Sequence, residues 1–284
     1  MPLFDRLKSA FAGSRLDVEA RFEFLRGPYP GRKSTVHVVR DRQTGETRAL
    51  KLLDAKKTAE FEARFKGLNK PSEGEISIKF DHPNIVKTFE HGVTTEGSPY
   101  LLMEPLGTGL NSLLPHGPQI FPGRRLTYFR QVAEALEVVH QKGFIHRDLS
   151  PRNLLFTEDG QTLKLTDFGG ALPASGRFLE PGNRTGTPHY MAPELIRLQR
   201  TDTRLDVFAF GVIAYQMCTF HIPWEGEAAA VHSQAPVDIR RWWPEMHPAL
   251  ADLIMSCIHP DVNKRCPSMA KFLQDLRRVP SETA

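Results

Sequence analysis

The chain has 284 residues, of which 40% are hydrophobic and 25% charged, and it contains 22 Pro and 21 Gly. This is the composition of an ordinary globular protein, and it excludes collagen-like, coiled-coil and largely disordered chains. The formal net charge is +4, and the whole excess lies in residues 1–103, which carry 18 Lys/Arg against 14 Asp/Glu. Because these charges are scattered rather than gathered in a stripe, we expect no nucleic-acid partner.

Apolar runs and cysteines bear on where the protein is found. The longest apolar stretch, residues 207–220, is interrupted by Gln216 and is short for a bilayer, so no transmembrane segment is expected. The first 15 residues mix charged with apolar side chains and lack the core of a secretory signal. We therefore predict a cytoplasmic location. Three cysteines without a CxxC pair are expected to be reduced packing residues: Cys218, Cys257 and Cys266.

Residues 1–21 form an N-terminal extension that contains an apolar stripe at helical spacing. The stripe consists of Leu3, Phe4, Leu7 and Phe11, and it predicts a short amphipathic helix. This helix either anchors the chain to a membrane surface or a partner, or it packs on the following domain or frays. We favour the second alternative.

The next part of the chain has the pattern of a β-sheet with one helix. Alternating apolar and polar residues on both sides of a Gly-containing turn at residues 42–46 predict a hairpin over residues 36–53. Residues 56–70 predict a helix. Residues 91–106 predict a second pair of strands joined by a turn, which includes the apolar strand 100–103.

Beyond residue 105 the apolar spacing becomes helical. Helices are expected over residues 126–141, 205–220, 249–257 and 268–276. The predicted fold class is α+β, with a small β-rich lobe followed by a larger, mainly helical one. The predicted boundaries are 22–103 for the N-lobe, 104–109 for the hinge, 110–277 for the C-lobe and 278–284 for a tail.

Two clusters of polar residues lie close together in the sequence and carry the chemistry. The first runs from His146 to Asn153 and contains Asp148, and the second is Asp167-Phe168-Gly169. An Asp, an Asn five residues on and a second Asp after a short strand pair put a base and two oxygen ligands for Mg²⁺ in one small volume. In this order and spacing the clusters closely resemble the catalytic core of the protein kinases.

A third segment, Gly186–Glu194, is similar to the one that ends the activation loop in kinases directed at Ser and Thr. On these residues the chain is identified as a member of the eukaryotic-type (Hanks-type) Ser/Thr protein kinase family over roughly residues 22–277. The resemblance implies a bilobal kinase fold with the nucleotide cleft between its lobes. It also implies ATP and Mg²⁺ as cofactors and a protein substrate with a Ser or Thr acceptor.

The resemblance further implies two structural supports in the larger lobe. Arg265 is expected to bridge Glu194. Asp206 is expected to hold the backbone at residues 146–147.

Catalytic roles follow from the resemblance as well. Asp148 is expected to accept or orient the proton of the substrate hydroxyl, and Arg152 and Thr187 are expected to be further catalytic residues. Asn153 and Asp167 are the expected Mg²⁺ ligands.

Lys51 stands where the family has its strand lysine. The resemblance implies that it holds the α and β phosphates of ATP and pairs with a helix carboxylate. Glu73, nine residues before His82, is the expected partner, and Glu75 is the alternative.

The implied nucleotide pocket has apolar walls around the adenine. The edge of the adenine is expected to hydrogen-bond to the main chain of residues 104–106, although Pro105 lacks an N–H. Its expected lining residues are Gly31, Val36, Ala49, Lys51, Glu73, Met103, Glu104, Leu106, Leu155 and Asp167.

The glycine-rich loop departs from the family pattern. Tyr29, Gly31 and Ser34 stand where three glycines are expected. Glycines let backbone N–H groups approach phosphate closely, so the departure bears on nucleotide affinity. Arg32 and Lys33 either supply side-chain charge instead or are solvated, and the basic excess of residues 1–103 belongs to the lobe expected to cover the triphosphate.

Two departures concern the substrate. Ser150 stands where Ser/Thr kinases usually carry a Lys that contacts the transferring phosphate, and Arg152 is placed to supply that charge, as in many tyrosine-directed kinases. Because Arg152 also replaces an acidic residue of kinases that prefer basic peptides, we predict no strong preference for basic substrates.

The activation loop departs too. Arg147 precedes Asp148, which is the arrangement in kinases whose activation loop is ordered by phosphorylation. The usual acceptor position is Asn183, so Thr185 and Ser175 remain as candidates, or the loop needs no phosphate.

Three functions are compatible with these residues. The first, which we favour, is an active Ser/Thr protein kinase. The second is a catalytically weak pseudokinase that acts as a nucleotide-binding or scaffold module; the glycine loop and Ser150 favour it, whereas the joint presence of Lys51, Asp148, Asn153 and Asp167 opposes it. The third is a small-molecule kinase of the same fold, against which the segment Gly186–Glu194 argues.

Overall fold

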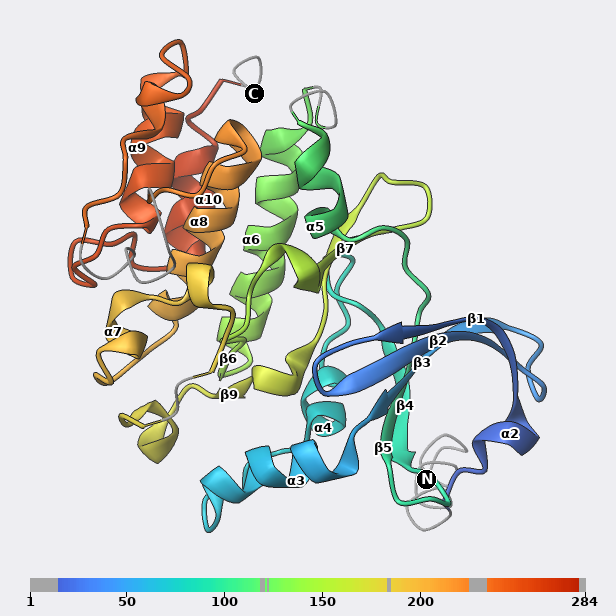
Figure 1. Ribbon diagram of the computed structural model, residues 1–284. Coiled ribbons are helices and arrows are strands. Elements are labelled where there is room, and N and C mark those ends of the chain that lie inside the picture. Colours follow the sequence, from blue (N-terminus) through green and yellow to red (C-terminus); the bar gives the residue numbers. More distant parts are fainter. Residues whose placement is uncertain (1–14, 118–120, 122, 183–184, 225–233, 281–284) are drawn as a thin grey trace, which may run out of the picture. The chain divides into compact units, whose positions relative to one another are not determined.

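A computed structural model describes residues 15–117, 121, 123–182, 185–224 and 234–280. The amphipathic helix predicted near Leu3–Phe11 lies outside the described residues. The chain divides into two compact units (Figure 1). Unit 1 comprises Met1–Asp81 and Lys87–Pro105, and unit 2 comprises His82–Val86 and Leu106–Ala284.

Unit 1 is built on a five-stranded antiparallel sheet in the order β1-β2-β3-β5-β4. The strands are β1 (Phe22–Pro30), β2 (Ser34–Asp41), β3 (Thr47–Leu53), β4 (Thr88–Val93) and β5 (Pro99–Met103). Gly45, at φ 74°, closes the β2–β3 turn, and its N–H donates to the Asp41 carbonyl at 2.7 Å. The predicted hairpin and second strand pair are therefore confirmed, although β4 begins three residues before His91.

The strand register gives the sheet two different faces. Lys51 is opposite Val36, and Ala49 is opposite Met103, so these four side chains share one face. The other face carries the apolar cluster of unit 1, formed by Phe22, Val39, Leu50, Tyr100 and Leu102. Burying each large apolar side chain contributes roughly 1.5–3 kcal/mol. This cluster therefore fixes which residues of β2, β3 and β5 point to the opposite face.

A short helix ties the strands of this sheet together. Helix α2 (Val18–Arg21) ends on Arg21, whose guanidinium contacts Asp41 Oδ2 at 2.8 Å and Glu90 Oε1 at 2.9 Å. Burial alone would raise the pKa of Asp41, but the hydrogen bonds and charge of Arg21 outweigh it and hold that pKa below its usual value. Arg21 thus links the end of β2 to β4.

The helix predicted over residues 56–70 is shorter than expected. Helix α3 (Ala55–Glu62) is capped by Asp54 and continues only into the 3₁₀ turn η1 (Ala63–Phe65). The prediction was wrong beyond that turn because Gly67 and Asn69 have φ angles of 80° and 49°, which a right-handed helix does not accommodate.

Unit 2 is mainly helical. Its α-helices are α5 (Leu110–Leu113), α6 (Arg125–Gln141), α7 (Pro193–Ile196), α8 (Arg204–Thr219), α9 (Pro248–Cys257) and α10 (Met269–Leu276). Its strands pair as β6 (Phe144–Ile145) with β9 (Leu172–Pro173), and β7 (Leu154–Phe156) with β8 (Leu163–Leu165). The 3₁₀ turns are η2 (Leu114–His116), η4 (Pro151–Asn153), η5 (Phe168–Gly170), η6 (Gly176–Leu179), η7 (Pro188–Tyr190) and η9 (Ile239–Arg241).

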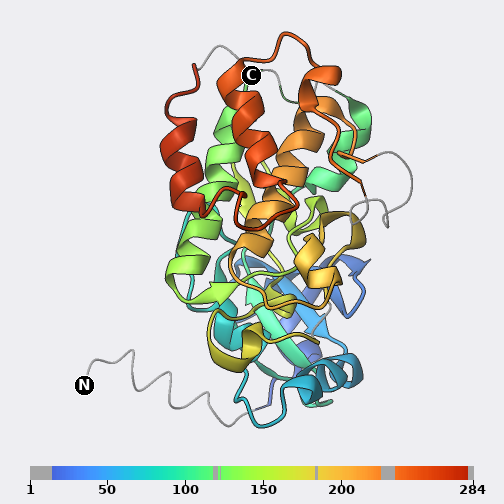
Figure 2. The same cartoon turned by 90° about the vertical axis from the view of Figure 1, so that its left-hand side faces the viewer.

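The four long helices of unit 2, α6, α8, α9 and α10, lie side by side (Figures 1 and 2). Helix α8 is buried along nearly its whole length and contacts both α6 and α9, which explains why its sequence is apolar on all sides. All four predicted helices are confirmed to within a residue at each end. Among the helices of the described residues, none has the length and apolar character needed to cross a membrane.

Both structural supports expected in the larger lobe are confirmed. Asp206, 1% exposed at the start of α8, accepts the N–H of His146 at 2.8 Å and that of Arg147 at 2.9 Å. Arg265 forms a two-pronged ion pair with Glu194, at 2.6 and 2.8 Å, with the two side chains 0% and 6% exposed. The Arg265–Glu194 pair fixes α7 against the loop that precedes α10.

We expect Arg265→Leu to lower the free energy of unfolding by about 3–5 kcal/mol, because it leaves the Glu194 carboxylate buried without its partner. Arg240→Leu is the matched control. Arg240 pairs with Asp238 and Asp252 at the surface, so its loss should leave the urea midpoint nearly unchanged. Equal shifts of the urea midpoint in both variants would contradict this account.

Candidate active site

Unit 1 contributes a buried ion pair. Lys51, in β3, places Nζ 2.6 Å from Oε1 of Glu73, and the two residues are 6% and 9% exposed. Glu75 takes no part in this pair, because its Oε2 accepts the N–H of Ser72 at 2.8 Å in a reciprocal capping box. Of the two expected partners, Glu73 is therefore the one that contacts Lys51.

Glu73 is the first residue of a helix with only five residues, α4 (Glu73–Ser77). Gly74 allows this helix to lie against β4: a Cβ at Gly74 would be 2.5 Å from Cγ of His91 and 2.6 Å from its Cβ. Pro and Gly are poor helix residues. Helix α4 starts after Pro71, and Gly74 serves the close contact with His91.

In unit 2, Asp148 lies at the centre of a hydrogen-bonded loop. Thr187 Oγ1 donates to Asp148 Oδ1 at 3.0 Å, and Asn153 Nδ2 donates to the Asp148 carbonyl at 2.7 Å. The loop is fixed on its other side by Asp206, which holds the two residues that precede Asp148. The loop thus brings Asp148, Asn153 and Thr187 together.

Asp167 is held beside this loop by its neighbours. Thr166 N–H donates to the Asn153 carbonyl at 3.0 Å, and the Phe168 ring packs edge-on against His146 with centroids 5.1 Å apart. Asp167 itself has a left-handed φ of 65°, and its Oδ1 accepts the N–H of Gly169 at 3.3 Å. A non-glycine residue with positive φ is uncommon and often marks a functional position.

The chemistry of these two side chains suits Mg²⁺. Asn153 uses its amide nitrogen toward Asp148, which leaves its amide oxygen as the ligand atom, and Asp167 offers a carboxylate. In the described ranges no group of three or more His, Cys, Asp and Glu side chains could hold a metal ion. One carboxylate and one amide fit Mg²⁺ nevertheless, because this ion commonly completes its octahedron with water and substrate phosphates.

The remaining residues that the sequence predicts for nucleotide binding come from both units. Val36, Ala49 and Met103 share the sheet face of Lys51 in unit 1. Glu104 is fixed there by Lys87, because its N–H donates to the Lys87 carbonyl at 3.0 Å and its Oε1 accepts the Lys87 N–H at 2.7 Å. Leu106 and Leu155 are half-buried residues of unit 2.

The β1–β2 turn contains the glycine-poor loop. Gly31 is exposed, and its N–H donates to the Ser34 carbonyl at 2.7 Å. Lys33 is not a purely solvated side chain, because its Nζ lies 4.2 Å from the centroid of the Phe61 ring in α3. The turn is therefore attached to α3 through Lys33.

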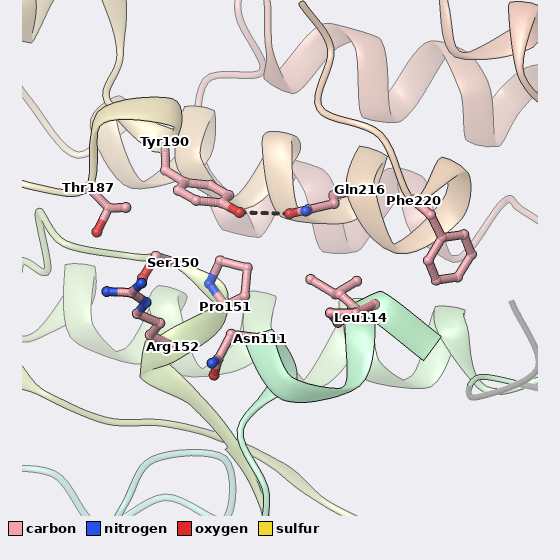
Figure 3. Close-up of a pocket in the computed structure, with 10 residues that line it drawn as sticks. Asn111, Leu114, Ser150, Pro151, Arg152, Thr187, Tyr190, Gln216 and Phe220 are labelled. Atoms are coloured by element: carbon pink, nitrogen blue, oxygen red, sulfur yellow. Dashed lines mark hydrogen bonds between the residues drawn. The ribbon is translucent and has the colours of Figure 1, made fainter. Parts of the chain in front are cut away.

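A pocket of about 280 Å³ lies next to Thr187 in unit 2 (Figure 3). One wall is made by Tyr190, whose hydroxyl donates to Gln216 Oε1 at 2.7 Å. The lining residues are Asn111, Leu114, Pro115, Ser150, Pro151, Arg152, Thr187, Tyr190, Gln216 and Phe220. The sequence indicated Arg152 and Thr187 as catalytic residues and Ser150 as a departure from the family pattern, but it did not name the others as site residues. The available signal was Gln216, the polar residue that interrupts the apolar run of α8.

A sheet with a buried Lys–Glu pair and a helical unit with an Asp–Asn loop beside Asp-Phe-Gly define the class of the protein, which is the bilobal protein kinase fold. The family model described as protein kinase domain matches residues 30–276. The chain therefore belongs to the protein kinase family, as a Hanks-type Ser/Thr kinase catalytic domain, which confirms the resemblance identified from the sequence.

Curated relatives come from bacteria and from a vertebrate. The chain is 31% identical to serine/threonine-protein kinase pkn2 of Myxococcus xanthus, over 93% of this chain and 33% of that protein. It is 28% identical to serine/threonine-protein kinase PrkC of Bacillus subtilis, over 92% and 40%. It is 34% identical to the hormonally up-regulated neu tumor-associated kinase homolog A of Xenopus laevis, over 84% and 34%. The chain thus matches between a third and two fifths of the length of these relatives.

We expect Gly74→Ala to destabilise the protein by about 1–3 kcal/mol and to disturb the Lys51–Glu73 pair, because the new methyl group overlaps His91. Replacing His91 by Gly removes the atoms in conflict. Urea unfolding should therefore show a smaller cost of Gly74→Ala in the His91→Gly background than in the wild type. An equal cost in both backgrounds would show that the contact with His91 is not what requires glycine.

Proposed function

We propose that this chain is an active ATP-dependent protein kinase that transfers the γ-phosphoryl group to Ser or Thr hydroxyls of a protein substrate. The observation that carries the proposal is that each reactive group has its own local support. Lys51 is paired with Glu73, Asp148 accepts from Thr187, and Asn153 is oriented by the Asp148 carbonyl. A pseudokinase, which does not catalyse phosphoryl transfer, would not need all these contacts.

Asp148 is the proposed base. The Thr187 hydroxyl occupies Oδ1 of this carboxylate and so orients the second oxygen toward the proton of the acceptor hydroxyl. Asp148 orients the hydroxyl or accepts its proton as transfer proceeds. Arg152, also a proposed catalytic residue, supplies the positive charge that Ser150 does not.

The proposed nucleotide contacts come from both units. Lys51, kept in place by Glu73, holds the α and β phosphates, and Gly31 lies in the loop proposed to cover them. Asn153 and Asp167 are the proposed Mg²⁺ ligands; the bound ion neutralises charge on the phosphate oxygens. Val36, Ala49 and Met103 of unit 1 and Leu155 of unit 2 are the proposed contacts of the adenine, and the main chain of Glu104 and Leu106 is proposed to hydrogen-bond to its edge.

The same contacts bear on the pseudokinase alternative. The comparisons contain no observation that favours a chain without catalysis. The glycine-poor β1–β2 turn affects ATP affinity rather than the transfer step, because the groups proposed for that step lie elsewhere in the chain. Family membership supports a protein substrate, and we propose no nucleic-acid partner.

Incubation of the full chain with Mg²⁺, labelled ATP and a mixed protein substrate tests the proposal. We expect label transfer, and a loss of roughly 10²–10⁴-fold in Asp148→Asn because this change removes the base. Lys51→Met and Asp167→Asn should also abolish transfer. Asp252→Asn, an exposed surface change, is the control and should retain wild-type activity. Thermal stabilisation by ATP without transfer would instead support the pseudokinase.

A further inference from the structure

The pocket next to Thr187 is joined to the base of the proposed reaction. Thr187 lines the pocket and also donates to Asp148. A peptide whose hydroxyl reaches Asp148 must therefore pass close to the mouth of this pocket. The pocket would therefore contact a part of the substrate, and the inference below rests on the proposed kinase function.

The polar end of the pocket is cationic and rich in donors. Arg152 is exposed there, and no hydrogen bond or ion pair joins its guanidinium to another residue of the described ranges. Farther along the wall, Gln216 uses its amide oxygen to accept from Tyr190 (Figure 3), which leaves its amide nitrogen as a donor. Among the described residues that line the pocket there is no Asp or Glu.

The tyrosine in this wall does not compensate the charge of Arg152. Burial raises the pKa of Tyr190 to about 12, and the nearby positive charge of Arg152 opposes this rise only in part. Tyr190 therefore stays neutral at physiological pH. Among the described lining residues, Arg152 is the one that carries a formal charge at this pH.

The opposite end of the pocket is apolar. Figure 3 shows Leu114 and Phe220 together at the end away from Thr187 and Arg152, with Pro151 between the two ends. Phe220 is held in place by a stacked contact with Phe121, at a centroid distance of 6.4 Å and an interplanar angle of 12°. This end is a fixed surface for an apolar side chain.

We propose that this pocket selects substrates in which an anionic side chain lies near the acceptor Ser or Thr and pairs with Arg152, while an apolar side chain beyond it packs on Leu114 and Phe220. A planar guanidinium binds carboxylate or phosphate oxygens in a two-pronged geometry. The anion is thus an Asp or Glu of the substrate, or a residue phosphorylated beforehand. The sequence predicted only that basic substrates are not strongly preferred; the pocket leads us to propose a preference for acidic substrates.

The test is a set of peptides that differ at one position near the acceptor, carrying Glu, Gln, Lys or phosphoserine in turn at each flanking position. For wild type we expect kcat/KM to be about 3- to 10-fold higher for Glu than for Gln at one position, and lowest for Lys, because a partly exposed charge pair is modest in strength. A larger value for phosphoserine than for Glu identifies a phosphorylated substrate as the preferred source of the anion. The advantage of the anion should shrink as salt rises.

Two variants separate selection from catalysis. Arg152→Glu should reverse the order of kcat/KM, so that the Lys peptide exceeds the Glu peptide. If Arg152 had a purely catalytic role, the variant would lower kcat/KM for all peptides by the same factor. Gln216→Glu, which leaves Arg152 in place, should weaken the preference for Glu. Arg278→Glu, a reversal at a side chain 71% exposed and outside the pocket, should leave the order unchanged. Equal kcat/KM values for Glu, Gln and Lys in wild type would overturn the proposal.

Binding measured by fluorescence anisotropy, with the acceptor replaced by Ala, separates the two proposals. Preferential binding of the Glu peptide with no transfer to any acceptor would support the pocket and overturn the proposed activity. Transfer to all peptides without preference in either assay would leave the activity intact and overturn the pocket.

Discussion

The buried carboxylate of Asp206 is the constraint on which the position of the Asp148 loop depends. It lies at the start of α8, almost without exposure, and receives the N–H groups of His146 and Arg147 together with a hydrogen bond from the His140 ring at 2.9 Å. Burial by itself would raise its pKa, but these donors hold the pKa below its usual value. A buried carboxylate that stays ionised demands such partners, so the position of the loop follows from α8.

From this anchor the site is assembled by short-range contacts. Asp148 follows the two residues that Asp206 holds, Asn153 bonds back to its carbonyl, and Thr166 bonds to Asn153 just before Asp167. The proposed base and both proposed metal ligands thus belong to segments joined by one hydrogen-bonded network. Unit 1 repeats the principle with Lys51 and Glu73, where a capping box starts α4 at the residue that must face the lysine.

Much of this was readable from the sequence, because period and spacing reflect local physics. The strands, the four long helices, the Lys51–Glu73 pair and the two supports at Asp206 and Arg265 were all expected before the structure. The early end of α3 was missed because two left-handed residues outweighed a helical pattern.

Features that join distant parts of the chain could not be derived this way. The close contact of Gly74 with His91 depends on how α4 meets β4. Residues 82–86 belong to unit 2 because Val86 N–H donates to the Leu165 carbonyl at 2.9 Å, a contact without a sequence signal. The pocket beside Thr187 combines side chains from residues 111 to 220, so the sequence indicated some of its residues but not that they line one pocket.

The central claim is that the network around Asp148 transfers a phosphoryl group to Ser and Thr. The most direct measurement is mass spectrometric mapping of phosphorylated residues in a protein substrate after incubation of the full chain with ATP and Mg²⁺. The account predicts new phosphoserine and phosphothreonine that are missing when the Asp148→Asn variant is used. Phosphorylation confined to tyrosine, or identical sites with both proteins, would contradict it.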